Sequence, residues 1–371
     1  MLHKFLKYDW VLISSVLLLM GISLAVLYSI STAGNLSDGE GISVFWKQVI
    51  FSVLGIAAFI LFAFSNYQSF KSYSSAIYFG TLLVLILVLI FGQNIRGTAG
   101  WINFGFFNVQ PVELSKLTLI IFLASFISQK KMELGEIGRL VASLVLCGAM
   151  IFLVIEQPDF GSAMVLISIW IGMTLVSGMS KKMIAAAIIL GIIATSLTWF
   201  QLQPYQKDRV MNLFKPGIDP QGSGYNVLQS IVAVGSGGII GKGIGHGSQS
   251  QLNFLPEKHT DFIFASIAEE LGIIGSFLVL GLFLIIFYRM TIIARNAPDN
   301  FGYLVTIGVM LMFFVQVLEN IGMNIGVMPV TGIPLPFLSY GGSSLIVSLA
   351  AVGIVMNVHS RKESVIRSDE Y

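Results

Sequence analysis

The sequence predicts an all-α polytopic membrane protein, folded as a single integral-membrane domain over residues 1–371. Of the 371 residues, 55% are hydrophobic and 11% are charged, and the mean hydropathy is +0.85. Since a soluble domain is about 25% charged, this composition excludes an ordinary soluble enzyme. The net charge of +2 leaves no basic surface for nucleic acid, and Cys147 is the only cysteine, which excludes a disulfide scaffold.

Ten mostly apolar segments along the chain are predicted transmembrane helices. Such a helix needs about 20 residues, because each residue rises about 1.5 Å through a hydrocarbon core about 30 Å thick. Several of the ten segments are shorter, and we expect their ends to move by about 2–4 residues. In chain order, the predicted spans are residues 10–30, 49–64, 76–91, 112–127, 140–155, 161–177, 183–200, 262–288, 303–318 and 341–358.

Lysine and arginine residues determine the predicted orientation, because short cytoplasmic loops collect them. With the N-terminus inside, 13 of the 21 basic residues fall on the cytoplasmic side, and both chain termini are cytoplasmic. These 13 residues are Lys4, Lys7, Lys71, Lys130, Lys131, Arg139, Lys181, Lys182, Arg289, Arg295, Arg361, Lys362 and Arg367.

The connection between the seventh and eighth predicted spans, residues 201–260, is one long extracytoplasmic loop. Connections in compact domains have a median length of about 4–6 residues, and much longer ones are usually functional or disordered. This loop contains an apolar stripe at helical spacing that could lie in the membrane interface. The stripe consists of Tyr225, Val227, Leu228, Ile231 and Val232. The sequence therefore predicts that the outer face carries the function.

Charged residues within a membrane are costly and rare, so each one indicates a possible functional site. Glu113 and Lys116, in the run 110–116 (QPVELSK), are three residues apart and share one helix face, where they can neutralise each other. The alternative is a purely structural ion pair. For Asp159, in the run 156–161 (EQPDFG), the favoured interpretation is an N-cap of the next span.

The long loop ends in the run 255–265 (LPEKHTDFIFA), where a polar turn precedes an apolar span. Asp261 is its deepest polar residue, directly before Phe262 and Ile263, and this position suits a general base. An equally weighted alternative is that Thr260 or Asp261 only caps the helix that follows. The same turn also contains Glu257, Lys258 and His259.

Two further segments are rich in glycine. Residues 235–247 (GSGGIIGKGIGHG) have amides that, with Lys242, could bind phosphate oxygens; the alternative is a loop that bends sharply near the membrane. His246 and His259 lack the spacing of metal ligands, so we infer no metal site. Residues 320–344 carry no charge and contain three prolines, so they cannot form one helix and should pack on protein or line a cavity.

Together these runs resemble the SEDS family (shape, elongation, division and sporulation proteins) of bacterial cell-wall synthesis. The resemblance extends from the first span to the last. Lys242, the run 249–252 (QSQL) and the short tails resemble the elongation (RodA) branch more than the division (FtsW) branch. The matching runs also include 96–102 (RGTAGWI), 110–116, 157–161 (QPDFG), 205–209 (YQKDR), 235–242, 257–265 and 320–344.

The resemblance implies a peptidoglycan glycosyltransferase of the bacterial cytoplasmic (inner) membrane, for cell elongation and rod shape. Such an enzyme polymerises lipid II into β-1,4 glycan strands at the outer face and releases undecaprenyl pyrophosphate. The resemblance also implies a class B penicillin-binding protein, a transpeptidase, as partner, and it places the family's essential loop aspartate on Asp261. Membrane lipids would surround the spans, and no nucleic acid is involved.

The reaction needs a base for the acceptor sugar's 4-hydroxyl, and Asp261 stands where a lipid-anchored sugar would lie. The pyrophosphate leaving group needs positive charge, for which the candidates are Arg96, Lys116, Lys207, Arg209, Lys242 and Lys258. Supporting roles are expected for Glu113, Asp159, Glu257, His259 and Thr260. No cofactor is implied, although a divalent cation could share the pyrophosphate charge.

Two rival functions remain at this point. A lipid II flippase would also have many spans and intramembrane charges, but it would need a polar path through both leaflets, whereas the polar groups here gather on one side and no internal repeat is visible. A non-catalytic scaffold for a transpeptidase would leave the polar cluster 257–261 unexplained. The sequence therefore favours the polymerase.

Overall fold

The computed structural model describes residues 8–33, 40–95, 98–105, 107–129, 135–178, 180–201, 207, 211, 223–252 and 254–361. A helix occupies each of the ten predicted spans. These helices are α2 (Trp10–Ala33), α3 (Glu40–Phe64), α5 (Ser74–Phe91), α6 (Pro111–Ser128), α7 (Glu136–Glu156), α8 (Phe160–Leu175), α9 (Lys181–Gln201), α13 (Ile263–Arg295), α14 (Asn300–Asn324) and α15 (Gly342–Ser360). Three described helices are shorter, namely α4 (Tyr67–Ser72), α11 (Ser223–Ser236) and α12 (Ser248–Gln251).

Eight of these helices are long and apolar enough to cross a membrane: α2, α3, α5, α6, α7, α13, α14 and α15. α8 is apolar but has only 16 residues, and α9 is not among the eight. The chain is therefore a helical protein with several spans, while the total of ten spans stays a prediction.

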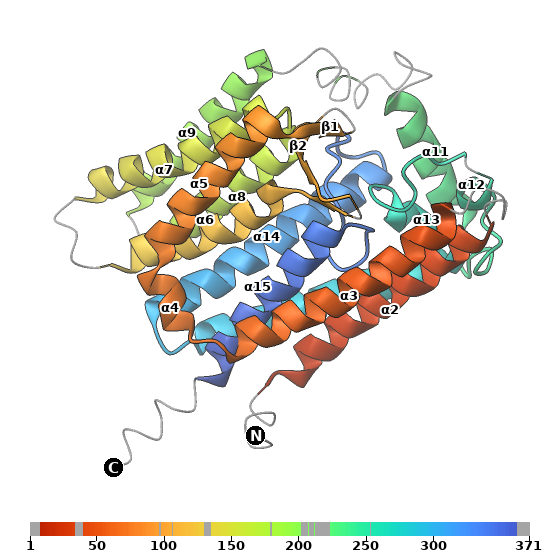
Figure 1. Ribbon diagram of the computed structural model, residues 1–371, viewed down its shortest axis with the longest axis horizontal. Coiled ribbons are helices and arrows are strands. Elements are labelled where there is room, and N and C mark those ends of the chain that lie inside the picture. Colours follow the sequence, from red (N-terminus) through yellow and green to blue (C-terminus); the bar gives the residue numbers. More distant parts are fainter. Residues whose placement is uncertain are drawn as a thin grey trace.

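The helices form one bundle with distinct ends. Figure 1 shows the start of α2, the end of α15 and α4 toward one end of the bundle, and β1, β2, α11 and α12 toward the other. α6, α14 and α15 lie at the centre, because most of the apolar stretch of each is buried, whereas less than half of the apolar stretch is buried in α2, α3, α5, α7 and α13. The outer helices expose apolar side chains such as Leu61, Phe91 and Phe277, which is typical of a surface that faces lipid.

The prediction of an all-α fold is wrong for the connection between α5 and α6. This segment forms a three-stranded antiparallel sheet in the order β1 (Gln93–Ile95), β2 (Thr98–Asn103) and β3 (Asn108–Val109). The chain must leave one helix and turn back into the next, and a hairpin pairs its backbone groups on the way. Trp101 and Ile102 are of the aromatic and β-branched types that favour strands.

α13 is broken at Gly272, which adopts φ 68° and ψ −162°. The glycine-rich loop fills the break. The amides of Lys242 and Gly243 donate to the carbonyls of Glu269 and Glu270, each at 3.0 Å. On the other side of the break, the amide of Ile273 donates to the Gly238 carbonyl at 2.9 Å, and that of Ile274 to the Ile239 carbonyl at 3.2 Å.

This pairing corrects the idea that the amides of this loop cradle phosphate, because helix carbonyls already occupy the amides of Lys242 and Gly243. The sharp bend near the membrane, which was the alternative, is what the structure shows. The close approach of this loop to α13 also explains why two positions are glycine. A Cβ on Gly272 would lie 2.3 Å from the Gly241 nitrogen, and one on Gly237 would lie 1.9 Å from the Ala268 carbonyl oxygen.

Candidate functional site

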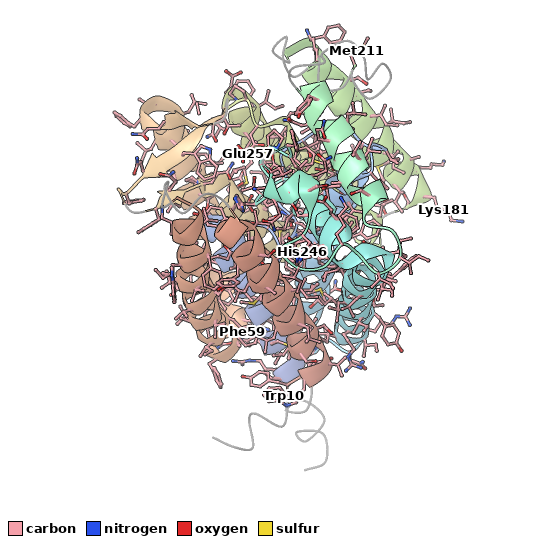
Figure 2. All side chains as sticks on the ribbon, turned by 90° about the vertical axis from the view of Figure 1, so that its right-hand side faces the viewer. Trp10, Phe59, Lys181, Met211, His246 and Glu257 are labelled. Atoms are coloured by element: carbon pink, nitrogen blue, oxygen red, sulfur yellow. The ribbon has the colours of Figure 1, made fainter. Side chains whose placement is uncertain are left out.

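A cavity of about 360 Å³ opens at the end of the bundle that carries β2, away from the start of α2. Its walls come from β2, the starts of α6 and α8, α11, the turn that precedes α13, and residues 330–334 and 340–344. Figure 2 shows Glu257, which lies in that turn, far from Trp10 at the start of α2. The uncharged segment 320–344 thus lines a cavity, as the sequence predicted.

Of the predicted site residues, five line this cavity: Glu113, Asp159, Glu257, Thr260 and Asp261. They are separated by up to about 150 residues along the chain, and the fold brings them together. The cavity therefore carries four carboxylates, with the polar side chains of Gln110 and Asn226 and the indole of Trp101 also in its walls.

Asp261 does not cap α13, which contradicts one of the two interpretations of this turn. The N-cap position belongs to Phe262, whose side chain makes no capping hydrogen bond. Instead, the Asn324 amide oxygen accepts from the Ala265 amide at 3.0 Å. The Asp261 carboxylate is thus not needed as a cap, and it lies beside Gly332, where a Cβ would be 3.6 Å from its Oδ2.

The turn before α13 has strained backbone. Glu257 adopts φ 52°, a left-handed conformation that costs a non-glycine residue about 1–2 kcal/mol. The strain is offset by contacts, since the Glu257 carbonyl accepts from the amides of Thr260 at 3.1 Å and Phe262 at 3.3 Å. The Thr260 hydroxyl also donates to the Glu257 carboxylate at 3.1 Å. Strained backbone conformations of this kind occur preferentially at functional sites.

The Glu113–Lys116 pair is present and deeply buried. The Lys116 Nζ lies 2.7 Å from Glu113 Oε1, and the side chains are 0% and 5% exposed. Asp159 is confirmed as the N-cap of α8, because its Oδ1 accepts from the Ser162 amide at 2.9 Å. Its Oδ2 also accepts from the Gln110 amide nitrogen at 3.2 Å, which ties the starts of α6 and α8 together.

The predicted pyrophosphate-binding cations do not gather at this cavity within the described residues. Lys116 pairs with Glu113, which lines the cavity, but Lys116 itself does not line it. Lys207 and His259 are not among the lining residues either. Lys242 donates to Glu269 and to the Ser248 hydroxyl, each at 2.8 Å, and Lys258 donates to the Ser250 carbonyl. Arg96 and Arg209 lie outside the described residues.

Lys242 and Lys258 belong instead to a second polar cluster around two adjacent glutamates of α13. Glu269 and Glu270 are both fully buried. Besides Lys242, Glu269 accepts from the amides of Gln249 and Ser250, each at 2.9 Å. Glu270 accepts from the Ser29 hydroxyl of α2 at 2.7 Å and from the Gln251 amide nitrogen at 2.9 Å. This cluster fastens residues 242–251 to α13 and α2.

Lys258 gives this cluster a pH dependence. Its side chain is buried, and burial lowers its pKa to about 8 although Glu270 and Glu269 act to raise it. Between pH 8 and the ordinary value of 10.5, the native state binds fewer protons than the unfolded state, so stability rises with pH across that interval. We expect the thermal unfolding midpoint in detergent to rise by a few degrees over it.

The variant Lys258→Met should flatten this rise, and Lys182→Met, which changes an exposed lysine, should leave it intact. An equal slope in wild type and Lys258→Met would show that another group produces the pH dependence.

Sequence reasoning missed the side chains that hold the turn before α13 in place. The Ser339 hydroxyl donates to the Thr260 carbonyl at 2.6 Å, and the amides of Asn320 and Asn324 donate to the Asp261 carbonyl, each at 3.0 Å. The only available signal was the presence of two asparagines one helical turn apart in an apolar span.

No group of three or more His, Cys, Asp or Glu side chains is arranged to hold a metal ion in the part of the chain that the structure describes. Whether a divalent cation shares the charge of the pyrophosphate is not tested by this observation, and that role stays a prediction.

The fold and the cavity define a class: a polytopic membrane protein with a carboxylate-lined site at one end of its bundle. A family model described as cell cycle protein (FtsW/RodA/SpoVE) matches residues 9–364. The chain therefore belongs to the SEDS family, as its motifs predicted.

Its relatives cover nearly the whole chain. Peptidoglycan glycosyltransferase MrdB of Escherichia coli is 37% identical over 333 residues, 90% of each chain. Stage V sporulation protein E of Bacillus subtilis is 38% identical over 356 residues, 94% of this chain and 96% of that protein.

Solved structures agree with the fold described above. One chain, from a study of the structural coordination of polymerization and crosslinking by a peptidoglycan synthase complex, is 31% identical with a TM-score of 0.78, and the match covers 96% of this chain and 98% of that one. The crystal structure of RodA of Thermus thermophilus is 27% identical with a TM-score of 0.70, covering 96% and 97%. The RodA type is thus represented among the matches, in line with the resemblance.

Proposed function

We propose that this chain is a peptidoglycan glycosyltransferase that polymerises lipid II into β-1,4 glycan strands for cell elongation and rod shape. The glycosyltransferase class follows from family membership, since relatives in Escherichia coli and Treponema pallidum carry that name. The observation that carries the finer proposal is the position of Asp261, whose side chain lines a cavity while two asparagines and a serine hold the adjoining backbone.

In the proposed reaction, the Asp261 carboxylate takes the proton from the 4-hydroxyl of the acceptor sugar. The oxygen attacks C1 of the donor sugar, forming the C1–O4 bond as the bond from C1 to the phosphate oxygen breaks. Undecaprenyl pyrophosphate leaves with the electron pair. One displacement with inversion needs one base and no covalent enzyme intermediate, and general-base assistance contributes about 10²–10⁴-fold in rate.

The membrane arrangement is part of the proposal. We infer ten spans in the bacterial cytoplasmic membrane, cytoplasmic termini and a single integral domain over residues 1–371, with the loop 201–260 and the cavity at the outer face. Support comes from the excess of basic residues on one side and from the location of the cavity at the end opposite the start of α2 and the end of α15.

A class B penicillin-binding protein is the proposed partner. The support is the structural similarity to a chain of a peptidoglycan synthase complex in which polymerization and crosslinking are coordinated. Coupling of the two activities would deliver each new glycan strand directly to a transpeptidase.

The decisive experiment is polymerisation of fluorescent lipid II by the purified protein, with and without a class B partner. We expect long glycan strands, resolved on a gel and digested by a muramidase. If no polymer forms in either sample, the same preparation is reconstituted in liposomes. Movement of lipid II between leaflets would then support the flippase, and neither activity would support the scaffold.

A further inference from the structure

The two asparagines of α14 that face the turn before α13 form an uncharged, buried junction. Asn320 and Asn324 are one helical turn apart and both 0% exposed. A buried amide that lacks hydrogen bonds costs about 1–3 kcal/mol on the scale of protein mutations, so their contacts indicate what the pair holds.

Asn324 connects three separate segments. Its Nδ2 donates to the Asp261 carbonyl at 3.0 Å and to the Asn320 carbonyl at 2.8 Å. Its Oδ1 accepts from the Ala265 amide at 3.0 Å, and its backbone carbonyl accepts from the Ser230 hydroxyl of α11 at 2.8 Å. Because the Ala265 amide can only donate, the amide oxygen of Asn324 must face it and the nitrogen must face the two carbonyls.

Both asparagines converge on the same atom. The Asn320 Nδ2 donates to the Asp261 carbonyl at 3.0 Å and to the Ile333 carbonyl at 2.8 Å. Two donors on one carbonyl fix the plane of the peptide that follows Asp261, and with it the direction in which the Asp261 side chain leaves the backbone. Ile333 adjoins Gly332, the residue beside which the carboxylate lies, so one amide pair holds both sides of this contact.

We propose that Asn324 is a positioning residue that aims the Asp261 carboxylate into the cavity, in addition to capping α13. The inference rests on the proposed function of Asp261 as the base. A misplacement of about 1 Å can lower a rate about 10²-fold, so loss of this contact should appear in kcat rather than in KM.

The variant Asn324→Asp separates the two roles. Aspartate keeps an oxygen that accepts from the Ala265 amide, so the cap survives, but it places a second oxygen against the Asp261 carbonyl where the donor stood. Asn324→Ser adds no charge, but its shorter side chain loses both the donor to the Asp261 carbonyl and the acceptor for the Ala265 amide, so the labelling measurement described below keeps the test informative if the aspartate variant folds poorly. We expect kcat to fall about 10- to 100-fold in both variants with KM little changed.

Asn357→Asp is the matched control. Asn357 is also a buried asparagine on a central helix, and its Nδ2 donates to the carbonyls of Phe62 and Ser65 near the cytoplasmic end. The change has the same chemistry and similar burial but lies far from Asp261. A fall in kcat equal to that of Asn324→Asp would reduce the role of Asn324 to general stability, and a wild-type kcat in folded Asn324→Asp would overturn the proposal.

A second readout does not depend on activity. In a Cys147→Ala background, Asp261→Cys places a thiol at the position of the carboxylate, and its labelling rate by a small methanethiosulfonate reports its exposure in the cavity. We expect Asn324→Asp to change this rate several-fold and Asn357→Asp to leave it unchanged. If wild type makes no glycan, the proposed function fails, while an altered labelling rate still supports the positioning role and an unaltered rate contradicts it.

Discussion

Replacement of Asp261 by asparagine is expected to abolish glycan polymerisation in a protein that remains folded. The amide has the shape of the carboxylate but cannot take a proton from the acceptor hydroxyl, so the rate should fall at least about 100-fold. The backbone carbonyl of residue 261 keeps its donors, Asn320 and Asn324, so the turn should hold its conformation. The measurement is the polymerisation of labelled lipid II by wild type and Asp261→Asn, each with and without the partner.

Asp299→Asn provides the control for this substitution. Asp299 caps the start of α14, at the end of that helix away from Asn320 and Asn324, by accepting from the Gly302 amide at 2.8 Å, and asparagine caps a helix as well as aspartate does. The same chemical change there should leave polymerisation close to wild type. More than a tenth of the wild-type rate in Asp261→Asn would remove Asp261 as the base.

Replacement of Lys116 by methionine is expected to destabilise the protein by about 3–5 kcal/mol, because it leaves a buried charge without its partner. Lys116 is completely buried and Glu113 almost so, with a separation of 2.7 Å between their charged atoms. The unfolding of the purified protein in mixed detergent, followed by circular dichroism, measures the change.

The double variant Glu113→Gln with Lys116→Met should recover much of the lost stability, since the Glu113 charge that Lys116 neutralises is then removed as well. A stable Lys116→Met protein that binds lipid II but does not polymerise it would contradict a structural pair. That outcome would instead favour contact between Lys116 and the pyrophosphate.

The helices could be predicted from the sequence because each span is a local property of about 20 apolar residues. The same reasoning missed the sheet β1–β3, since a short connection gives little periodicity to detect. It left phosphate binding open for the glycine-rich loop, because the carbonyls that accept from the amides of Lys242 and Gly243 belong to Glu269 and Glu270, which lie in a different predicted element.

Asp261 and its neighbours were identified as a candidate site from local crowding of polar residues, but their geometry depends on distant partners. Asn324 lies 63 residues beyond Asp261 along the chain, and nothing in either local sequence indicates the contact. The contact of Lys242 with Glu269 could not be predicted either, because the two residues are 27 positions apart and lie in different predicted elements.

The break in α13 has a consequence for how the protein enters the membrane. Lipid offers no hydrogen-bond partner to an open backbone group, so the carbonyls and amides on either side of Gly272 need residues 238–243 already in place. In the proposed orientation, this stretch, which precedes α13 along the chain, must cross to the outer side before the helix can settle in the bilayer. Translocation of the loop and insertion of the span are therefore one assembly step, and a tag inserted at residues 238–243 would block biogenesis rather than catalysis.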